Sequence, residues 1–251
     1  ELFRKQLKGL EGITEERLSE IFLELQDAGA HNINLVTATQ YLPSVLPALD
    51  RVKDRLHIPV VYNCGGYEKP ETLARLRDYV DIYLPDLKYY DSALSMRYSM
   101  APDYFSAASK AIPYMIEQTG APRFDDNGLL KSGVIIRHMV LPAVEKIHPA
   151  AALDQENLPD NHYLISLLSQ FTPFYKSSGY PEINRRITTY EYESVLEEAV
   201  RLGLTDGYMQ EKSSAKEEYT PPFDLEGYRQ CQKSFPVFTV EGFLSAVTYY
   251  L

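Results

Sequence analysis

Apolar residues recur along this chain with two different spacings, and the two spacings alternate. Between residues 13 and 28 they lie three and four positions apart, which is the spacing of one face of a helix. Thr14 can cap this helix, and Gly29 can end it. Short apolar runs rich in β-branched residues separate the helical stretches and predict strands. The full prediction comprises helices at 13–28, 41–56, 70–78, 103–118 and 188–202, and strands at 33–37, 58–64, 80–84, 133–141, 162–169 and 208–211.

The order of these elements predicts an α/β fold. Helices and strands that alternate with short connections are typical of a parallel sheet with right-handed crossovers. The 251 residues, 45% of them hydrophobic, are enough for one large α/β barrel or two small domains. We expect a single domain over residues 13–221, with peripheral segments at 1–12 and 222–251 that show no clear period.

Charge and cysteine content exclude several classes of protein. A net charge of -10 argues against a long nucleic-acid groove, because neutralising phosphates needs clustered Lys and Arg. The two cysteines, Cys64 and Cys231, are too few for a disulfide framework and lack a metal-ligand spacing, which predicts a reducing, cytoplasmic setting. The longest apolar runs have the length of a strand, so the sequence predicts no membrane span or signal peptide. The chain begins with Glu1 rather than Met, which we interpret as a fragment or a processed product.

Two candidate functional residues follow the third predicted strand. Asp86 and Lys88 follow it directly, two positions apart, within the run Tyr-Leu-Pro-Asp-Leu-Lys-Tyr-Tyr. Side chains two apart on an extended segment point to the same face. Because ligands bind at the carboxyl ends of strands in parallel α/β folds, we expect this acid and this base to share one site.

Polar or small residues also follow or occupy the other predicted strands at the same end of the sheet. The candidates are Thr37 and Thr39 after the first strand, Asn63 in the second, Arg137 in the fourth and Gln170 after the fifth. Together with Asp86 and Lys88 they could hold a zwitterionic ligand. In that interpretation the Asp receives an ammonium group or ribose hydroxyls, while the Lys and Arg bind a carboxylate.

Each of these stretches taken singly also has a structural explanation, since Thr and Asn cap helices and Gly65-Gly66 makes a turn. His138 lies in mid-strand and faces away from Arg137, so a ligand role is the minor alternative for it. Arg185-Arg186 is by default a solvated pair, with an anion or peptide contact as the alternative. No nucleophile elbow, phosphate-binding loop or zinc spacing is present in the sequence.

The run Asp86-Leu87-Lys88 after a strand resembles the D-x-K motif of radical S-adenosylmethionine enzymes of the pyruvate formate-lyase activating enzyme type. Four further stretches resemble a bacterial activase-like branch of that family, and the resemblance covers roughly residues 13 to 223. These stretches are Gly-Ala-His-Asn-Ile-Asn-Leu-Val-Thr (29–37), Val-Tyr-Asn-Cys-Gly-Gly-Tyr (61–67), Val-Ile-Ile-Arg-His-Met-Val-Leu-Pro (134–142) and Tyr-Pro-Glu-Ile-Asn-Arg-Arg (180–186). The resemblance implies a partial (β/α)₆ TIM-like barrel that lacks its first strand and cluster loop.

The resemblance also implies roles for residues that would bind the methionine part of S-adenosylmethionine. Thr37 and Thr39 lie where the family's second-strand motif meets the methionine amino group. Asn63 and the glycines after it lie near the methionine carboxylate.

The remaining implied roles concern the rest of the cofactor. Asp86 and Lys88 fall at the cofactor-binding D-x-K positions. Arg137 lies on the strand that helps to orient cofactor and substrate. Gln170 lies at the end of the strand that lines the adenine side.

The sequence departs from the family in one respect that bears directly on function. The family carries Cys-x₃-Cys-x₂-Cys, whose thiolates hold three irons of a 4Fe–4S cluster. Residues 1–12 contain no cysteine, and Cys64 and Cys231 cannot replace three closely spaced ligands. We therefore expect no radical chemistry from this chain by itself. Residues 143–160 and 222–251 also drift from the family pattern.

Three functional hypotheses remain open from the sequence. The first is an activase-like oxidoreductase that cleaves S-adenosylmethionine reductively to a 5′-deoxyadenosyl radical. Its partners would be a glycyl-radical protein or a small molecule as substrate and a reductant such as flavodoxin or ferredoxin. The second is a non-enzymatic barrel remnant that binds a nucleoside-like ligand or a protein partner. The third and weakest is a glycoside hydrolase that uses Asp86 and Glu211 as its carboxylate pair.

Overall fold

The computed structural model describes residues 14–143, 158, 161–173, 175–204 and 206–209. The predicted peripheral segments 1–12 and 222–251 lie outside these ranges, and so do Cys231, Glu211 and most of the divergent stretch 143–160.

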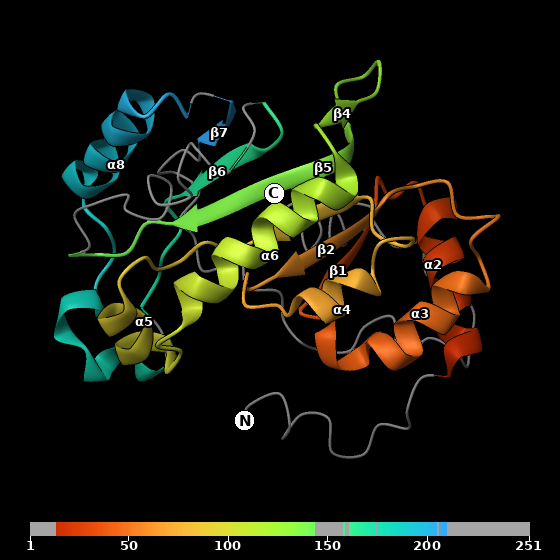
Figure 1. The fold of residues 1–251 in the computed structure, drawn as a ribbon, viewed down its shortest axis with the longest axis horizontal. Helices are drawn as coiled ribbons and strands as arrows, with labels where there is room; N and C mark the ends of the chain where they lie inside the picture. The colour runs from red at the N-terminus through yellow and green to blue at the C-terminus, as the bar shows by residue number, and fades with distance from the viewer. Residues whose placement is uncertain (1–13, 144–157, 159–160, 174, 205, 210–251) are drawn as a thin grey trace.

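The centre of the molecule is a seven-stranded sheet with the order β1-β2-β3-β5-β6-β7, in which the neighbours along this path are parallel. The short β4 pairs antiparallel with β5 and forms the projecting hairpin of Figure 1. The strands are β1 (Ile33–Val36), β2 (Val60–Cys64), β3 (Ile82–Pro85), β4 (Arg123–Phe124), β5 (Leu130–Met139), β6 (Leu164–Leu168) and β7 (Gly207–Met209). In the described ranges β1 and β7 do not pair with each other, so the sheet is open. The prediction of an α/β fold with a partial, TIM-like barrel is confirmed.

Helices connect the parallel strands, as the alternating pattern predicts. They are α2 (Glu15–Asp27), α3 (Leu42–Asp50), α4 (Pro70–Ala74), α5 (Ser92–Ser99), α6 (Tyr104–Thr119) and α8 (Thr189–Arg201), with 3₁₀ turns η1 (Thr39–Tyr41), η2 (Tyr175–Gly179) and η3 (Pro181–Ile183). In Figure 1, α6 crosses in front of the sheet and packs against β5, while α2 and α3 pack together near β1.

Three helices differ from the prediction. The helix predicted at 70–78 ends at Ala74. The helix predicted at 41–56 ends at Asp50, and turns follow it. The side chain of Gln26 donates to the Arg55 carbonyl at 3.1 Å and accepts from the His57 amide at 2.6 Å, so it takes up backbone groups that a longer helix would use. The unpredicted α5 is short, and its N-cap is Asp91, whose carboxylate accepts from the Ala93 amide at 2.6 Å.

The sheet is buried on both faces in its centre. One face packs under the helices through Val60, Tyr62 and Tyr83. The opposite face carries a smaller apolar cluster of Val61, Ile82, Leu84 and Ile135. Strands buried on both faces are typical of parallel α/β sheets and explain why β2 and β3 read as continuous apolar runs.

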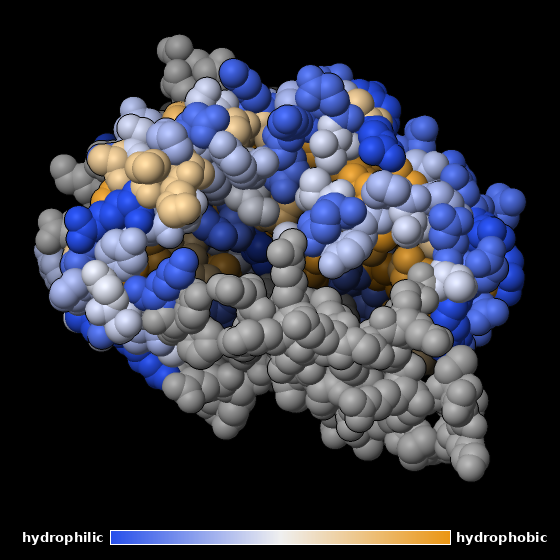
Figure 2. Space-filling view, turned by 90° about the horizontal axis from the view of Figure 1, so that it is seen from below, coloured by the Kyte–Doolittle hydropathy of each residue, from blue (hydrophilic) through white to orange (hydrophobic). Residues whose placement is uncertain are grey.

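The molecular surface is mixed in character. Seen from below, it is mainly hydrophilic at its outer margin, and hydrophobic residues come to the surface toward the middle (Figure 2). Within the described ranges, no helix has both the length and the hydrophobicity that a membrane crossing requires.

A capping box begins α8. The Thr188 hydroxyl accepts from the Glu191 amide, and the Glu191 carboxylate accepts from the Thr188 amide. The same carboxylate accepts from the Ala143 amide at 2.8 Å and from Arg185 at 2.6 and 2.8 Å. These hydrogen bonds hold the pKa of Glu191 well below its usual range, with the Arg185 guanidinium as the largest cause. Glu191 therefore joins α8, the loop before it and the chain after β5.

Arg185 and Arg186 are both exposed, in agreement with their interpretation as a solvated pair, and the structure adds an ion pair for Arg185. Arg185 is engaged with Glu191 through both terminal nitrogens. Fork-to-fork contacts of this kind are geometrically specific. The role of Arg185 in the described structure is therefore to fix the loop before α8.

We expect Glu191→Gln to lower the free energy of unfolding by about 2–3 kcal/mol at pH 7, because it removes charge-assisted hydrogen bonds to Arg185 and to two backbone amides. A carboxyl whose pKa is lowered by folding stabilises the protein above its unfolded pKa of about 4.3 and loses that contribution as the pH falls. Urea unfolding at pH 7 and at lower pH should therefore show the difference between the two proteins shrinking below about pH 4.

The exposed Glu197 on the same helix provides the matched control. Glu197→Gln should change the free energy of unfolding by no more than about 0.5 kcal/mol. Equal effects of the two substitutions at pH 7 would contradict the role given to Glu191.

Candidate functional site

The backbone places Asp86 between two neighbouring strands. It follows Pro85 at the end of β3 and forms an isolated parallel bridge with Arg137 of β5. The Asp86 amide donates to the Cys64 carbonyl at 2.9 Å, and the Leu87 amide donates to the Arg137 carbonyl at 2.8 Å. The Asp-x-Lys segment is thus held in the sheet at its carboxyl edge, where parallel folds bind ligands.

Four of the predicted site residues meet in one network. The Asp86 carboxylate pairs with Arg137 at 2.6 Å through Oδ1 and with Lys88 at 3.0 Å through Oδ2. Nη2 of Arg137 also donates to Oδ1 of Asn63 at 2.7 Å. The side chain of Arg137 is 7% exposed, that of Asp86 19% and that of Lys88 42%, so the network runs from the interior to the surface. The expected meeting of Asp86 with Lys88 occurs, and Arg137 is the buried partner of both Asp86 and Asn63.

The loop after β2 fits closely against this network. Gly66 has a φ of +76°, and a Cβ at this position would overlap the carbonyl oxygen of Asp86. The buried Tyr104 hydroxyl lies 2.7 Å from the Asp86 carbonyl and 2.9 Å from the Gly65 carbonyl, and it accepts from the Lys88 amide at 3.0 Å. Burial raises the pKa of Tyr104, which keeps the phenol protonated. The Tyr104 side chain of α6 therefore holds the loop after β2 against the segment after β3.

The two predicted threonines differ in their placement. Thr37 has a φ of +51°, an uncommon conformation for a β-branched residue, and its amide donates to the Asn63 carbonyl at 2.9 Å. The Thr39 hydroxyl lies 2.7 Å from the Tyr62 hydroxyl. Tyr62 packs on the helix-covered face, so its side chain lies on the other side of β2 from that of Asn63. Thr37 is thus beside the network, whereas the Thr39 hydroxyl is directed to the opposite face.

His138 and Gln170 are placed differently from Arg137 with respect to Asp86. His138 faces away from Arg137, as predicted, and its Nδ1 donates to the Leu87 carbonyl at 2.7 Å. Burial lowers the pKa of His138 and favours the neutral ring, so this histidine fixes the Asp-x-Lys backbone. Gln170 lies two residues beyond Leu168 at the end of β6, one strand further from β3 than Arg137 is.

Glu68 is a candidate that the sequence analysis does not single out. It is half-buried in the loop after β2. Burial is the largest effect on its carboxyl group and raises the pKa above the usual value. The charge of Asp86 also raises this pKa, whereas a hydrogen bond with Cys64 lowers it. Its Oε2 has no hydrogen-bond partner among the described residues, and the same holds for Nδ2 of Asn63, a residue only 3% exposed. Its position two residues after Gly66, at the carboxyl end of a strand, is the signal that points to it.

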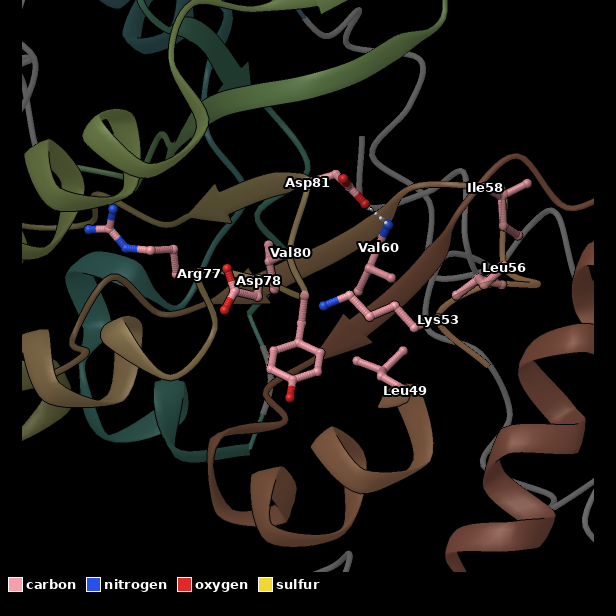
Figure 3. A pocket seen from close by; sticks show the side chains of 10 residues that line it. Leu49, Lys53, Leu56, Ile58, Val60, Arg77, Asp78, Val80 and Asp81 are labelled. Atoms are coloured by element: carbon pink, nitrogen blue, oxygen red, sulfur yellow. Dashed lines mark hydrogen bonds between the residues drawn. The ribbon is translucent and has the colours of Figure 1, made fainter. Parts of the chain in front are cut away.

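A cavity lies at the opposite end of the same strands. It has a volume of about 250 Å³ and is bordered by Lys53 and Tyr79, whose ammonium and ring centroid are 5.6 Å apart. Figure 3 shows Asp81 turned toward the backbone of Val60, whose amide donates to the Asp81 carboxylate at 2.8 Å. The cavity thus flanks the beginnings of β2 and β3, and the Asp86 network is not part of it.

The described ranges offer no ready metal site. They contain no group of three or more His, Cys, Asp or Glu side chains arranged to hold a metal ion. Cys64 is buried there as a free thiol, and burial raises its pKa. The carboxylate pair of Asp86 and Glu211 is not tested, because Glu211 lies outside the described residues.

Comparison with known proteins places the fold. No protein-family model matches the chain. The uncharacterized protein MJ0674 of Methanocaldococcus jannaschii is 31% identical over 181 residues, a match that covers 69% of this chain and about half (47%) of that protein.

Two solved structures have similar chain traces. A domain of pyruvate-formate lyase-activating enzyme from Bacteroides vulgatus is 14% identical, with a TM-score of 0.49 over 72% of this chain and 98% of that one. Streptococcus suis SuiB is 16% identical, with a TM-score of 0.53 over 86% of this chain and 48% of that one. The chain therefore shares the fold of part of SuiB.

Proposed function

We propose that this chain binds S-adenosylmethionine at the carboxyl edge of its sheet, as the cofactor-binding part of a radical S-adenosylmethionine enzyme of the activase type. The observation that carries the proposal is the network of Asn63, Asp86, Lys88 and Arg137. Its members come from three neighbouring strands, and they coincide with the positions at which the sequence resembles that family. The shared fold with SuiB is compatible with the proposal but says nothing of the ligand.

The described residues fit the amino-acid part of this cofactor. Nδ2 of Asn63 is a buried donor with no partner in the described ranges, and such donors are rare unless a ligand or water meets them. Lys88 is half-exposed at the edge of the network and can reach a carboxylate. In the proposal Asn63 and Lys88 hold the carboxylate, and Thr37 lies beside the amino group. Thr39 and Gln170 keep the roles that the resemblance implies, with Gln170 on the adenine side.

When bound and given one electron by a reductant, such a cofactor would supply a 5′-deoxyadenosyl radical through cleavage of its sulfonium–C5′ bond, with methionine as the other product. The contribution of this chain is to bind and orient it. Arg137 fixes the Asp86 carboxylate from the protein interior, and Tyr104 fixes the loops on either side. The network is built from buried, mutually bonded groups, which is the arrangement that orients a ligand precisely enough for a reaction.

A 4Fe–4S cluster does not fit the residues of this chain. The 251 residues contain two cysteines, of which Cys64 is buried under the helices, whereas a cluster of this type takes three or four thiolates. The proposal requires cluster ligands from another stretch of polypeptide and an electron from a reductant such as flavodoxin or ferredoxin.

The proposed substrate is a glycine of a glycyl-radical protein, with a small molecule as the alternative. The support is the activase-like sequence resemblance in the stretches that include Asn63, Asp86 and Arg137. Incubating the iron–sulfur-reconstituted protein, together with a polypeptide that supplies the cluster ligands, with a glycyl-radical protein should yield 5′-deoxyadenosine and an organic radical signal on that protein. 5′-deoxyadenosine without radical transfer would favour the small molecule, and no 5′-deoxyadenosine would favour the non-enzymatic remnant.

Binding to the chain itself is the first test of the proposed function. Calorimetric titration with S-adenosylhomocysteine should show a single site, and Lys88→Met should weaken binding by about 10- to 100-fold, because a charge-assisted hydrogen bond to the ligand carboxylate is lost. Lys69→Met, at an exposed position in the loop after β2, is the matched control and should bind as the unaltered protein does. An equal loss of affinity in both variants would show that binding depends on the overall positive charge at this edge of the sheet and not on Lys88 itself.

A further inference from the structure

We infer that Glu68 is a ligand-binding residue whose carboxylate receives the cationic group of the ligand at the Asp86 site. The inference rests on the proposed function and deepens it, because it names an acceptor that the sequence resemblance leaves out. From the sequence alone, Asp86 is expected to receive an ammonium group or ribose hydroxyls. The structure gives that aspartate a different role.

Both oxygens of Asp86 already face cations. Oδ1 lies 2.6 Å from Arg137, and Oδ2 lies 3.0 Å from Lys88. A ligand ammonium that approached this carboxylate would meet two fixed positive charges at short range. Like charges at such separations repel each other strongly in a partly buried site. Asp86 therefore serves to position Arg137 and Lys88, and the ammonium needs another acceptor.

Glu68 has the free capacity that Asp86 lacks. Its Oε2 is buried and has no hydrogen-bond partner within the described part of the chain. The carboxyl lies beside Cys64 at the end of β2 and close enough to Asp86 and Lys88 for their charges to shift its pKa. A thiol is only a weak donor, so Cys64 does not meet the needs of a carboxylate.

The loop geometry brings Glu68 to the network. Gly66, two residues earlier, packs its backbone against the Asp86 carbonyl so closely that a Cβ would not fit. The adjoining Gly65 carbonyl lies 2.9 Å from the Tyr104 hydroxyl, and that hydroxyl also contacts the Asp86 carbonyl. The loop that carries Glu68 is therefore fixed against the Asp-x-Lys segment.

An unmet donor accompanies this unmet acceptor. Nδ2 of Asn63 is buried and without a partner among the described residues, while its Oδ1 accepts from Arg137. Buried polar atoms are nearly always hydrogen-bonded in folded proteins, so two unmet atoms near one strand end call for an explanation. In the inference the ligand carboxylate meets Nδ2 of Asn63, and the ligand ammonium group meets Oε2 of Glu68.

The net charge of the site also supports Glu68 as the acceptor. Asp86, Arg137 and Lys88 together carry a net charge of +1. An ionised Glu68 brings the site to neutrality, which matches a zwitterionic ligand. Burial raises the pKa of Glu68, and an ammonium group placed beside it would favour the ionised form.

The test compares two ligands that differ in their amino-acid part. S-adenosylhomocysteine carries it, and methylthioadenosine does not. By calorimetry, Glu68→Gln should weaken S-adenosylhomocysteine binding by about 10- to 100-fold and leave methylthioadenosine binding unchanged. The exposed Glu71→Gln on α4 is the matched control and should bind both ligands as the unaltered protein does. If Glu68→Gln fails to fold, Glu68→Asp should show the same selective loss, because its carboxylate is withdrawn by one methylene.

The outcomes separate the inference from the proposed function. Equal S-adenosylhomocysteine affinity of the unaltered protein and Glu68→Gln would overturn the inference and leave the proposed function standing. Equal weakening of both nucleosides would also overturn it, because Glu68 would then act only through the fold. If the unaltered protein binds neither nucleoside, the proposed function fails. In that case l-methionine methyl ester, a cation without a carboxylate, decides the inference: a shift of the labelled Glu68 carboxyl resonance supports it, and no shift overturns it.

Discussion

Replacing Gly66 with alanine is expected to lower the free energy of unfolding by about 2–4 kcal/mol and to abolish ligand binding at the Asp86 site. A Cβ here would overlap the Asp86 carbonyl oxygen, a backbone atom that cannot rotate away. The φ of +76° adds strain for any residue with a side chain. Because Asp86 is bridged to Arg137, a displaced Asp86 backbone would also disturb the ion pair between them. Urea unfolding and calorimetric titration with S-adenosylhomocysteine would measure the two effects.

Gly65 supplies the control from the same turn. A Cβ on Gly65 meets nothing within 4 Å, so Gly65→Ala should stay within about 1 kcal/mol of the unaltered protein. If both alanine variants prove equally stable, then the close approach of the loop to Asp86 does not constrain the site. That result would also remove one support for the placement of Glu68.

The second large effect is expected from Arg137→Met, which should lower the free energy of unfolding by about 3–5 kcal/mol. Arg137 is nearly fully buried, and its guanidinium binds both the Asp86 carboxylate and Oδ1 of Asn63. Methionine has a similar volume, so the loss would reflect the broken buried ion pair, which leaves Asp86 with Lys88 as its cation, and not a cavity. Denaturant unfolding of the purified variant would measure it.

A double-mutant cycle makes this prediction specific. Asp86→Asn removes the charge that Arg137 balances, so the double variant should be more stable than the sum of the single effects allows, by about 1 kcal/mol or more. Arg77→Met is the control for a surface ion pair, since Arg77 lies 3.8 Å from Glu117 and is half-exposed, and it should cost at most about 1 kcal/mol. Additive effects at Asp86 and Arg137 would contradict the coupling.

The sequence predicted the type and order of most elements because the signals for them are local. The helical spacing before Gly29 and the β-branched run that ends at Cys64 both depend on residues close in the chain. The capping box of α8 is equally local, and the structure contains it. Helix ends depend also on contacts between distant residues. Beyond Asp50, where the helix after Tyr41 ends, a side chain from α2 binds the backbone of Arg55 and His57, and no local pattern records that contact.

By itself, then, the sequence determined the α/β alternation and the position of Asp86 and Lys88 at the end of a strand. It also determined that these two side chains share one face, because side chains alternate along any extended segment. Only the tertiary structure decided which partners they have. Arg137 reaches Asp86 because β5 lies beside β3 in the sheet, although β4 and two helices separate the two strands in the sequence. The direction of the Thr39 hydroxyl and the unmet oxygen of Glu68 likewise depend on which elements pack together. Contacts between distant segments are set by the packing of the whole sheet and its helices, and residue spacing carries no information about them.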